Sequence, residues 1–497
     1  MYVYVSKKRN FIDLKTRKIV QSQFLDQYEL GEKVTKFLDD KLADMDPFSV
    51  NTYLYIAYYQ LLYKYYSFDY MLPRQILENS ADVFNGDVAL LPKTNHTWFE
   101  KKQWYCLPDR FFPPFYWMQR IKSDLSFRSN KFFTVTHADM LAIIGHPIHD
   151  DICSAFMKYL PEYSLAYFPE LEHTIRHEIE NPTFERHINE DMQALWEAMP
   201  VKKRIVQRLI RDRISHYYRV LSHYHPKIVL SFNEPHYDAG IVCYVASLLN
   251  IRTVNVAHAI SIGWQRRHSP YDFHLVYGQS SVDYLRAGKG LILGELEPVG
   301  APRFDHVLSY ESVQFQDSAQ SGKKRIVIFS DSTDEGFIDF KFDYLKLLQS
   351  YFELNNVGLE VLVKKHPRET AHWEEVFLGK FPFVKFSDGT RNNADLIDWA
   401  DSVLVCQIIS TSGIEVILRN RLLGIINRAD NRDVLKYQQF ETAFIIKSEK
   451  DISEFLEMSA NDVLNDRYRK FLDYHIANRG HAAEQIATFI EPLMHKE

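Results

Sequence analysis

Residues 227–257 read KIVLSFNEPHYDAGIVCYVASLLNIRTVNVA, and this stretch decides the fold class. Residues 227–232 form a short apolar run typical of a buried strand, residues 237–249 indicate a helix, and residues 252–257 indicate a second strand. Residues 273–277 and the helical pattern after Ser280 repeat the unit. Strand–helix alternation at this spacing predicts βαβ units and a parallel sheet.

A second alternating series follows a polar segment, residues 312–323, which we expect to be a linker. Its predicted strands are residues 325–329, 359–364, 383–386, 402–406, 422–426 and 443–446. We therefore predict an α/β protein with two Rossmann-like domains that face a cleft. The predicted parts are an N-terminal domain over 1–310 (a helical region to about residue 130, then a Rossmann-like part over 131–310), a C-terminal domain over 323–475, and residues 476–497, whose helix over 481–494 packs back across the domains.

The composition excludes several classes of protein. A chain of 497 residues with 46% hydrophobic and 25% charged residues is too long for one core and too ordinary for a disordered or fibrous protein. The net charge of −6 gives no case for binding nucleic acid. The four cysteines form no CxxC pair, and no apolar run approaches the ~20 residues that span a bilayer. We expect a cytoplasmic protein.

Three polar segments follow predicted strands of the second domain, where open parallel sheets bind ligands. They are residues 330–336 (SDSTDEG), 364–368 (KKHPR) and 410–415 (STSGIE). Hydroxyls and a glycine at a helix N-terminus suit a phosphate, although an ordinary helix cap is the alternative, and the neighbouring cations favour phosphate. Glu415 could accept hydrogen bonds from a ribose. The predicted donor-nucleotide residues are Lys364, His366, Arg368, Ser410, Thr411, Ser412, Gly413 and Glu415.

Two motifs carry a family resemblance. VLVKKHPRE at 361–369, followed by IISTSGIEVILRN at 408–420, resembles the nucleotide-binding half of bacterial GT-B glycosyltransferases of capsule and lipopolysaccharide synthesis, such as Kdo transferases and sialyltransferases. VGAPRFD at 299–305 is similar to a motif that ends the first domain in these enzymes and in glycerophosphate transferases of teichoic acid synthesis. The resemblance covers roughly residues 225–430. It implies that His366 binds the donor phosphate and that the hydroxyls of 410–412 cradle it.

Three residues are candidates for catalysis. VNVAHA at 254–259 is similar to a strand that ends in a cleft-facing histidine in these families, which points to His258. Glu234 follows the preceding strand, so its loop should open beside that of His258, and either residue could serve as acid, base or nucleophile. Each could instead be an ordinary loop residue. Asp334 belongs to an Asp-Glu-Gly triplet similar to one that supplies the base in some sialyltransferases, but here it follows a strand of the second domain.

Two other patterns have plainer explanations. HPIHDD at 146–151 resembles part of a metal site, but capping of a helix by its aspartates is the simpler interpretation, and Asp44 and Asp46 form an isolated D-x-D. We therefore predict chemistry without a metal. Residues 201–221 form a basic amphipathic helix that either packs on the core or contacts anionic lipid.

The resemblance implies a glycosyltransferase that moves a sugar from a CMP-activated donor to a cell-surface polysaccharide or glycolipid. Kdo or a sialic-type nonulosonate is the expected sugar, and no cofactor beyond the nucleotide-sugar donor is expected. Such an enzyme would be cytoplasmic, with peripheral contact to the inner membrane. A polyol-phosphate transferase using a CDP-glycerol-type donor, a nucleotide-sugar epimerase and a non-catalytic protein of the same fold are the alternatives.

Overall fold

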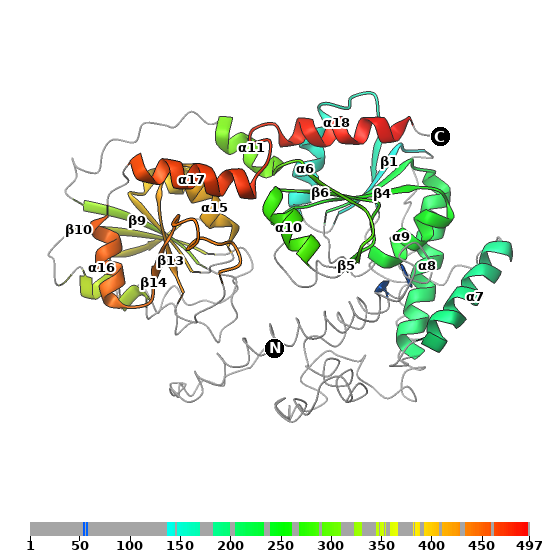
Figure 1. Cartoon of the computed structure of the whole chain (residues 1–497), viewed down its shortest axis with the longest axis horizontal. Coiled ribbons are helices and arrows are strands. Elements are labelled where there is room, and N and C mark those ends of the chain that lie inside the picture. Colours follow the sequence, from blue (N-terminus) through cyan, green and yellow to red (C-terminus); the bar gives the residue numbers. More distant parts are fainter. Residues whose placement is uncertain are drawn as a thin grey trace.

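The computed structural model has two α/β lobes side by side (Figure 1). The residues it describes are 53–54, 56–57, 137–144, 147–168, 182–198, 204–232, 239–260, 268–287, 291–309, 323–330, 344–346, 348–351, 353, 358–365, 381, 383–387, 392–406, 410–427, 433–458 and 462–495. Most of the predicted N-terminal helical region therefore lies outside the described residues. Residues 53–54 and 56–57 are helical there.

The first lobe is built on six parallel strands in the order β2-β1-β3-β4-β6-β8. They are β1 (Met140–Ile143), β2 (Leu165–Tyr167), β3 (Ile228–Ser231), β4 (Arg252–Val256), β6 (Phe273–Val276) and β8 (Glu295–Pro298), and β5 (His268–Ser269) pairs separately with β7 (Leu291–Ile292). The helices of this lobe are α6 (Pro147–Met157), α7 (Pro182–Ala198), α8 (Arg204–Tyr224), α9 (Ala239–Leu248), α10 (Gln279–Ala287) and α11 (Pro302–Ser309).

Both faces of this sheet are covered, which explains why its strands read as continuous apolar runs. Side chains of α8 and α9 share one core cluster with Leu141 and Val229. Side chains of α6 and of the last helix, α18 (Ala482–Met494), share another with Ile228 and Val254. The C-terminal helix thus completes the core of the first lobe rather than that of the second (Figure 1).

The second lobe has six parallel strands in the order β11-β10-β9-β12-β13-β14. They are β9 (Lys323–Phe329), β10 (Gly358–Lys364), β11 (Val384–Phe386), β12 (Ser402–Val405), β13 (Leu422–Ile426) and β14 (Phe444–Ile446). The main helices are α14 (Asn393–Trp399), α15 (Thr411–Leu418), α16 (Glu449–Glu457) and α17 (Asp462–His475). α14, α15 and α17 pack on one face and α16 on the other.

Two parallel sheets with flanking helices confirm the predicted fold class, the two-domain GT-B architecture. Each strand predicted for the second lobe exists, with ends that differ by at most two residues. Three strands of the first sheet, β1, β2 and β8, were not predicted, although β1 is a short apolar run. β2 has only three residues, and β8 carries two glutamates, so neither shows the apolar run of a buried strand. Both lie at the edges of the sheet, where that run is not required.

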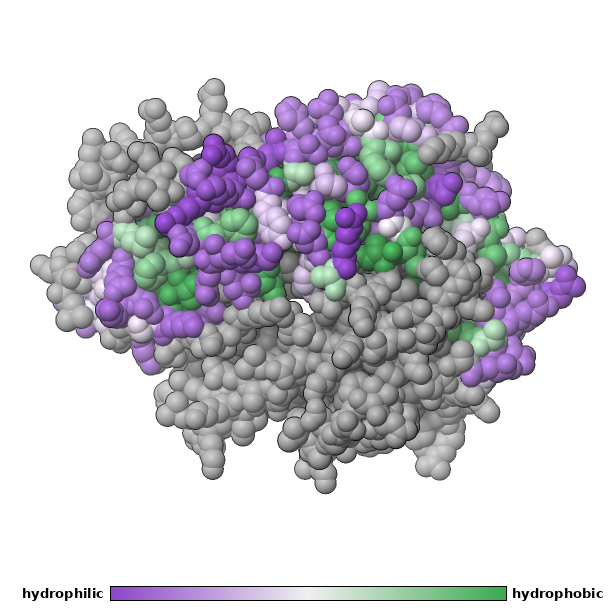
Figure 2. All heavy atoms as spheres, viewed as in Figure 1, coloured by the Kyte–Doolittle hydropathy of each residue, from purple (hydrophilic) through white to green (hydrophobic). Residues whose placement is uncertain are grey.

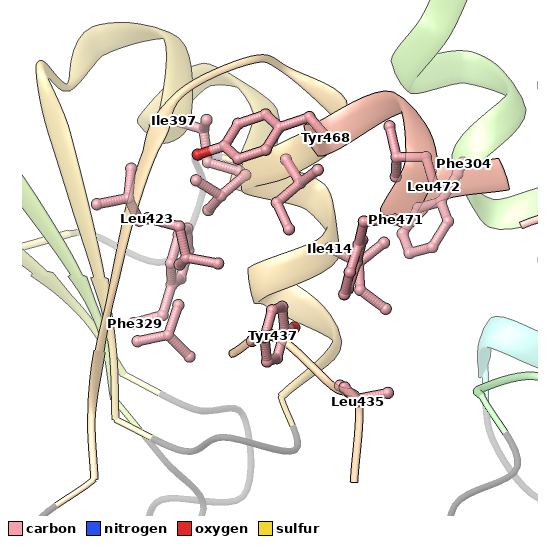
Figure 3. Close-up of a cluster of buried hydrophobic side chains, with 14 of the residues drawn as sticks. Phe304, Phe329, Ile397, Ile414, Leu423, Leu435, Tyr437, Tyr468, Phe471 and Leu472 are labelled. Carbon is pink, nitrogen blue, oxygen red and sulfur yellow. The ribbon is translucent and has the colours of Figure 1, made fainter. Parts of the chain in front are cut away.

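The two lobes share a hydrophobic core. Tyr277 and Phe304 of the first lobe pack in one cluster with Ile414, Tyr437 and Phe471 of the second. Figure 3 shows Phe304 against Leu472 and Phe471 of α17. The outward face of α17 is hydrophilic (Figure 2). This shared core places the carboxyl ends of β4 and β6 next to the second lobe.

The motif at 299–305 lies at this junction, and each of its distinctive residues has a contact there. Gly300 has φ +102°, and a Cβ on it would lie 2.4 Å from the carbonyl oxygen of Ala477, so only glycine fits. The carboxylate of Asp305 accepts hydrogen bonds from the backbone N–H groups of Ala482 and Ala483, at 3.2 and 2.9 Å. Asp305 therefore caps α18 and fixes the point at which the chain returns to the first lobe.

Each sheet has one place where the strand order reverses. In the first sheet β1 lies between β2 and β3, and in the second β9 lies between β10 and β12. At such a switch point the connections leave to opposite faces and open a crevice at the carboxyl ends of the strands, where ligands of open α/β sheets bind. The chain segments after β1 and β3, and those after β9 and β12, are therefore the ones to inspect.

Candidate functional site

Beside the switch point of the first sheet, His258 follows β4, the strand next to β3, and is held by its neighbours. Its Nδ1 is hydrogen-bonded to the carbonyl oxygen of Phe232, the residue after β3. Because a carbonyl can only accept, the proton is on Nδ1, and Nε2 of the neutral ring carries the lone pair. The hydroxyl of buried Tyr277 donates to the carbonyl oxygen of His258 at 2.7 Å. His258 therefore has the tautomer that a general base using Nε2 requires.

A second histidine contacts the same group. His149, in the first turn of α6 after β1, is 3% exposed. Its ring stacks on that of Phe232, with centroids 5.3 Å apart, and meets that of His258 edge-on at 5.1 Å. The sequence suggested a metal ligand or a helix cap within 146–151. In the structure His149 is a member of a three-ring cluster with Phe232 and His258.

Asp150, the neighbour of His149, connects α6 to the edge of the sheet. Its carboxylate accepts a hydrogen bond of 2.7 Å from the hydroxyl of Tyr167, at the end of β2. Burial and this carboxylate raise the pKa of the Tyr167 hydroxyl, so it stays a donor at all ordinary pH values. The first turn of α6 is thus tied to a strand two positions from β3.

At the switch point of the second sheet, the N-terminus of α15 follows β12. Ser410 is its N-cap, and its Oγ accepts from the backbone N–H of Ser412 at 3.3 Å. The hydroxyls of Thr411 and Ser412 are half-buried and have no hydrogen-bond partner among the residues that the structure describes. The helix end therefore presents two hydroxyls and the positive end of its dipole, which suits a phosphate.

Gly413 is buried and has a packing role. A Cβ at this position would lie 2.6 Å from the hydroxyl oxygen of Tyr437, whose ring fills the space beside the first turn of α15. Tyr437 also donates to the carbonyl oxygen of Ser410 at 3.4 Å. Tyr437 thus supports the N-terminus of α15 from behind, and the glycine makes this approach possible.

Glu415, 6% exposed, joins the two lobes. Its Oε1 accepts from Arg303 of α11 at 2.8 Å, and its Oε2 accepts from the amide of Asn393 at the start of α14, also at 2.8 Å. The sequence suggested a ribose-binding role, but it gave no sign of these two partners. Arg303 belongs to the motif at 299–305, so that motif reaches directly into the predicted nucleotide site.

Lys364 lies half-buried at the end of β10, close enough to Glu415 and Asp395 for their charges to interact. Burial lowers the pKa of the Lys364 ammonium, and the two carboxylates oppose that shift. The two carboxylates favour the charged form of this lysine. It can supply positive charge near the N-terminus of α15.

Ser330, which follows β9, begins the polar segment 330–336 that the sequence indicated, but it was not among the predicted site residues. It is 7% exposed, and its Oγ has no hydrogen-bond partner in the described part of the chain. The signal was present in its position after the first strand of the second sheet. Its importance depends on β9 being a switch-point strand, which strand order alone reveals.

Several predicted site residues lie outside the described residues: Glu234, Asp334, His366 and Arg368. The same holds for His146, Asp44 and Asp46 of the patterns considered for metal binding. Within the described ranges, no group of three or more His, Cys, Asp or Glu residues is arranged to hold a metal ion.

The basic helix predicted at 201–221 corresponds to α8. Its apolar side chains, including Ile210, Ile214 and Leu221, belong to the core cluster under the first sheet. Arg211 pairs with Glu185 of α7 at 3.3 Å. Arg208 and Arg219 lie on the exposed side of the helix. The apolar face is therefore already used inside the lobe. Among the described helices, none combines the length and hydrophobicity needed to cross a membrane.

No family model matches the chain, and no curated protein sequence matches it. Solved structures do. The UDP-GlcNAc 2-epimerase of Methanocaldococcus jannaschii, in complex with UDP-GlcNAc and UDP, is 13% identical with a TM-score of 0.46, covering 71% of this chain and 99% of its own. Acinetobacter baumannii MurG is 10% identical with a TM-score of 0.44, over 71% and 99%. The wall teichoic acid polymerase TagF is 12% identical with a TM-score of 0.43, over 77% and 94%. At such values, function has to rest on the residues of this chain.

Proposed function

We propose that the protein is a glycosyltransferase that binds a nucleotide-activated sugar at the switch point of its second sheet and transfers the sugar to an acceptor hydroxyl activated by His258. The observation that carries the proposal is the N-terminus of α15 at that switch point, where the hydroxyls of Thr411 and Ser412 have no hydrogen-bond partner within the described ranges. Lys364 of the neighbouring strand edge supplies a cation. Helix dipole, hydroxyl donors and a lysine together stabilise a phosphate that gains charge as it departs.

The reaction would proceed as follows. Nε2 of His258 takes the proton of the acceptor hydroxyl while the acceptor oxygen forms a bond to the anomeric carbon. The bond from that carbon to the phosphate oxygen of the donor breaks, and the nucleotide leaves with the electron pair. The ion pair of Arg303 with Glu415 and the shared core join the two lobes.

The donor in this proposal is a CMP-activated keto-acid sugar, Kdo or a sialic-type nonulosonate. Support comes from the resemblance of 361–369 and 408–420 to transferases that use such donors. Each oxygen of Glu415 has a second lone pair, so the carboxylate can accept from ribose hydroxyls while it keeps Arg303 and Asn393. The acceptor would be a growing cell-surface polysaccharide or glycolipid, and exposed Arg208 and Arg219 would favour contact with an anionic membrane.

A polyol-phosphate transferase is the second candidate, and the motif at 299–305 favours it because glycerophosphate transferases share that motif. His258 would again activate the acceptor hydroxyl. The bond broken would then be the one between the two phosphates of a CDP-polyol, with CMP as the common product. An epimerase would need no acceptor. In such an enzyme His258 would take part in a proton transfer on the nucleotide sugar itself.

A thermal-shift panel tests the nucleotide first. CMP, CDP, UDP and GDP are compared, followed by CMP-Kdo, CMP-N-acetylneuraminate and CDP-glycerol. We expect CMP and a CMP-sugar to stabilise the protein, by about 2.7 kcal/mol at a concentration 100 times Kd. Stabilisation by CDP-glycerol but not by the CMP-sugars would select the second candidate. Stabilisation by UDP or GDP alone would contradict the cytidine donor, and no response to any nucleotide would contradict the site.

Removal of metals is a separate check on the mechanism. Since the proposed phosphate site uses Lys364 and a helix N-terminus, we expect transfer to continue in EDTA. Loss of transfer in EDTA that Mg²⁺ or Mn²⁺ restores would contradict this expectation and return attention to Asp44, Asp46 and His146.

A further inference from the structure

We infer that His149 is a positioning residue for His258: through its ring contacts with His258 and Phe232 it holds the base in the one orientation that presents Nε2 to the acceptor. The kinetic part of this inference rests on the proposed function. The structural part, that His149 sets the orientation and tautomer of His258, does not.

The geometry links the three rings in a closed set. His149 stacks on the Phe232 ring at 5.3 Å with an interplanar angle of 23°, and it meets the His258 ring at 5.1 Å and 61°. The backbone carbonyl of Phe232 in turn accepts the Nδ1 proton of His258. His149 therefore contacts both the base and the residue that fixes the tautomer of the base.

The strand order places this set where a ligand would bind. His149 follows β1 and Phe232 follows β3, and these neighbouring strands form the switch point of the first sheet. An aromatic ring is needed there, because it fills the space between Phe232 and His258.

α6 itself is well anchored, so His149 can act as a rigid support. The Asp150–Tyr167 hydrogen bond ties its first turn to β2, and Ile152, Cys153 and Phe156 bury its inner face in the core. A base that is held by a rigid neighbour is already oriented for reaction. A displacement of the reacting group by about 1 Å can reduce a rate by about 10²-fold.

Two substitutions separate ring packing from ring chemistry. His149→Leu keeps a similar volume but removes the planar ring, whereas His149→Phe keeps the ring and removes its nitrogens. His223→Leu is the matched control, since His223 makes an edge-on contact of 5.1 Å with Tyr224 in the last turn of α8, before β3 begins. That contact lies at the opposite end of the strands.

The first readout is the tautomer of His258, measured by NMR of ¹⁵N-labelled imidazoles and assigned with His258→Gln. We expect a pure Nδ1–H form in the wild type, a mixture of tautomers in His149→Leu, recovery in His149→Phe and no change in His223→Leu. This readout needs neither donor nor acceptor. A pure Nδ1–H form in His149→Leu would overturn the inference.

The second readout is steady-state transfer with CMP-Kdo or CMP-N-acetylneuraminate. His149→Leu should lower kcat by about 10-fold and leave the donor KM unchanged, because orientation matters only as the bond forms. His149→Phe should regain most of the lost kcat. If the Phe variant is as slow as the Leu variant, the nitrogens of His149 take part in the chemistry and a positioning role is wrong. Absence of transfer in the wild type would count against the proposed function alone, since the tautomer readout stands without it.

Discussion

The two switch points of this protein have the same topology and opposite chemistry. In the first sheet the segments after β1, β3 and β4 bring together the aromatic and imidazole rings of His149, Phe232 and His258. In the second sheet the equivalent edge holds a helix N-terminus with Thr411 and Ser412, and the cation of Lys364.

The difference indicates how the two sheets of one architecture can take different roles in a transfer reaction. Rings packed against one another suit a group whose proton must be held at one atom, whereas a dipole, hydroxyls and an ammonium suit a charged phosphate. The ion pair of Arg303 with Glu415, at 2.8 Å, connects the two edges. Substitutions at each edge and at the connection should therefore have different signatures.

The largest effect should come from a substitution of His258, at the carboxyl ends of the first sheet's strands. His258→Ala removes the base, so turnover should fall by about 10²-fold or more while CMP affinity stays unchanged. Steady-state kinetics measures the turnover, and calorimetry measures the affinity for CMP. His137→Ala, on an exposed histidine before β1, is the control. If His258→Ala keeps near-normal turnover, the base lies elsewhere, and Glu234, Asp334 and Glu335 become the residues to test.

The connection between the edges should show mainly in stability. Arg303→Met leaves the nearly buried carboxylate of Glu415 with Asn393 as its hydrogen-bond donor. We expect a loss of about 2 kcal/mol in the free energy of unfolding, since an unpaired buried charge is costly. Arg211→Met breaks the exposed pair with Glu185 and should cost less than about 1 kcal/mol. Equal effects in urea denaturation would show that Arg303 does not act as a buried connection.

At the second edge, Lys364→Met should weaken nucleotide binding by roughly 10-fold, the scale of one charge-assisted hydrogen bond. Lys324 is a close control. It is also half-buried, burial also lowers the pKa of its ammonium, and it lies at the opposite end of the same sheet. Calorimetry with CMP should separate the two variants. Equal affinities would place the phosphate away from Lys364.

CMP binding by a Ser410/Thr411 double alanine variant, again measured by calorimetry, tests the N-terminus of α15. This variant removes the N-cap of α15 together with the hydroxyl of Thr411, and we expect CMP affinity to fall by roughly 10-fold. Serine at 412 is kept, so its hydroxyl remains as an internal reference. Unchanged CMP binding in this variant would return Ser410 to the role of an ordinary helix cap.

A further effect depends on pH and concerns the contact between the lobes. The ring of His475 lies between the hydroxyl of Ser280 in the first lobe and the carbonyl oxygen of Leu435. Burial there lowers its pKa to about 4. Between about pH 4 and 6.5 the unfolded chain binds a proton that the native ring does not, so stability falls as pH drops, by about 1 kcal/mol per pH unit. His475→Gln removes this proton uptake on unfolding. The dependence of the free energy of unfolding on pH, measured by urea denaturation at several pH values, should therefore become weaker. An unchanged slope would contradict a neutral His475.

The sequence predicted the strands well because buried parallel strands are continuous apolar runs. β13 matches its prediction, residues 422–426, at both ends. It predicted His258 and the N-terminus of α15 because each directly follows such a run. It did not select His149, because the pattern at 146–151 shows polar residues in a helix start and nothing of the rings they would meet. Nor could it show that Glu415 would meet Arg303, 112 residues away.

What the sequence alone determined is therefore local: which segments are strands, which are helices, and which polar residues stand at their ends. These properties follow from periodicity and from the chemistry of helix termini, which act over a few residues. Only the tertiary structure decided the order of the strands, and with it the two switch points, the ring cluster at His258 and the pairing of Arg303 with Glu415. Those contacts join residues far apart in the chain, so they depend on how whole lobes pack and leave no periodic trace in the sequence.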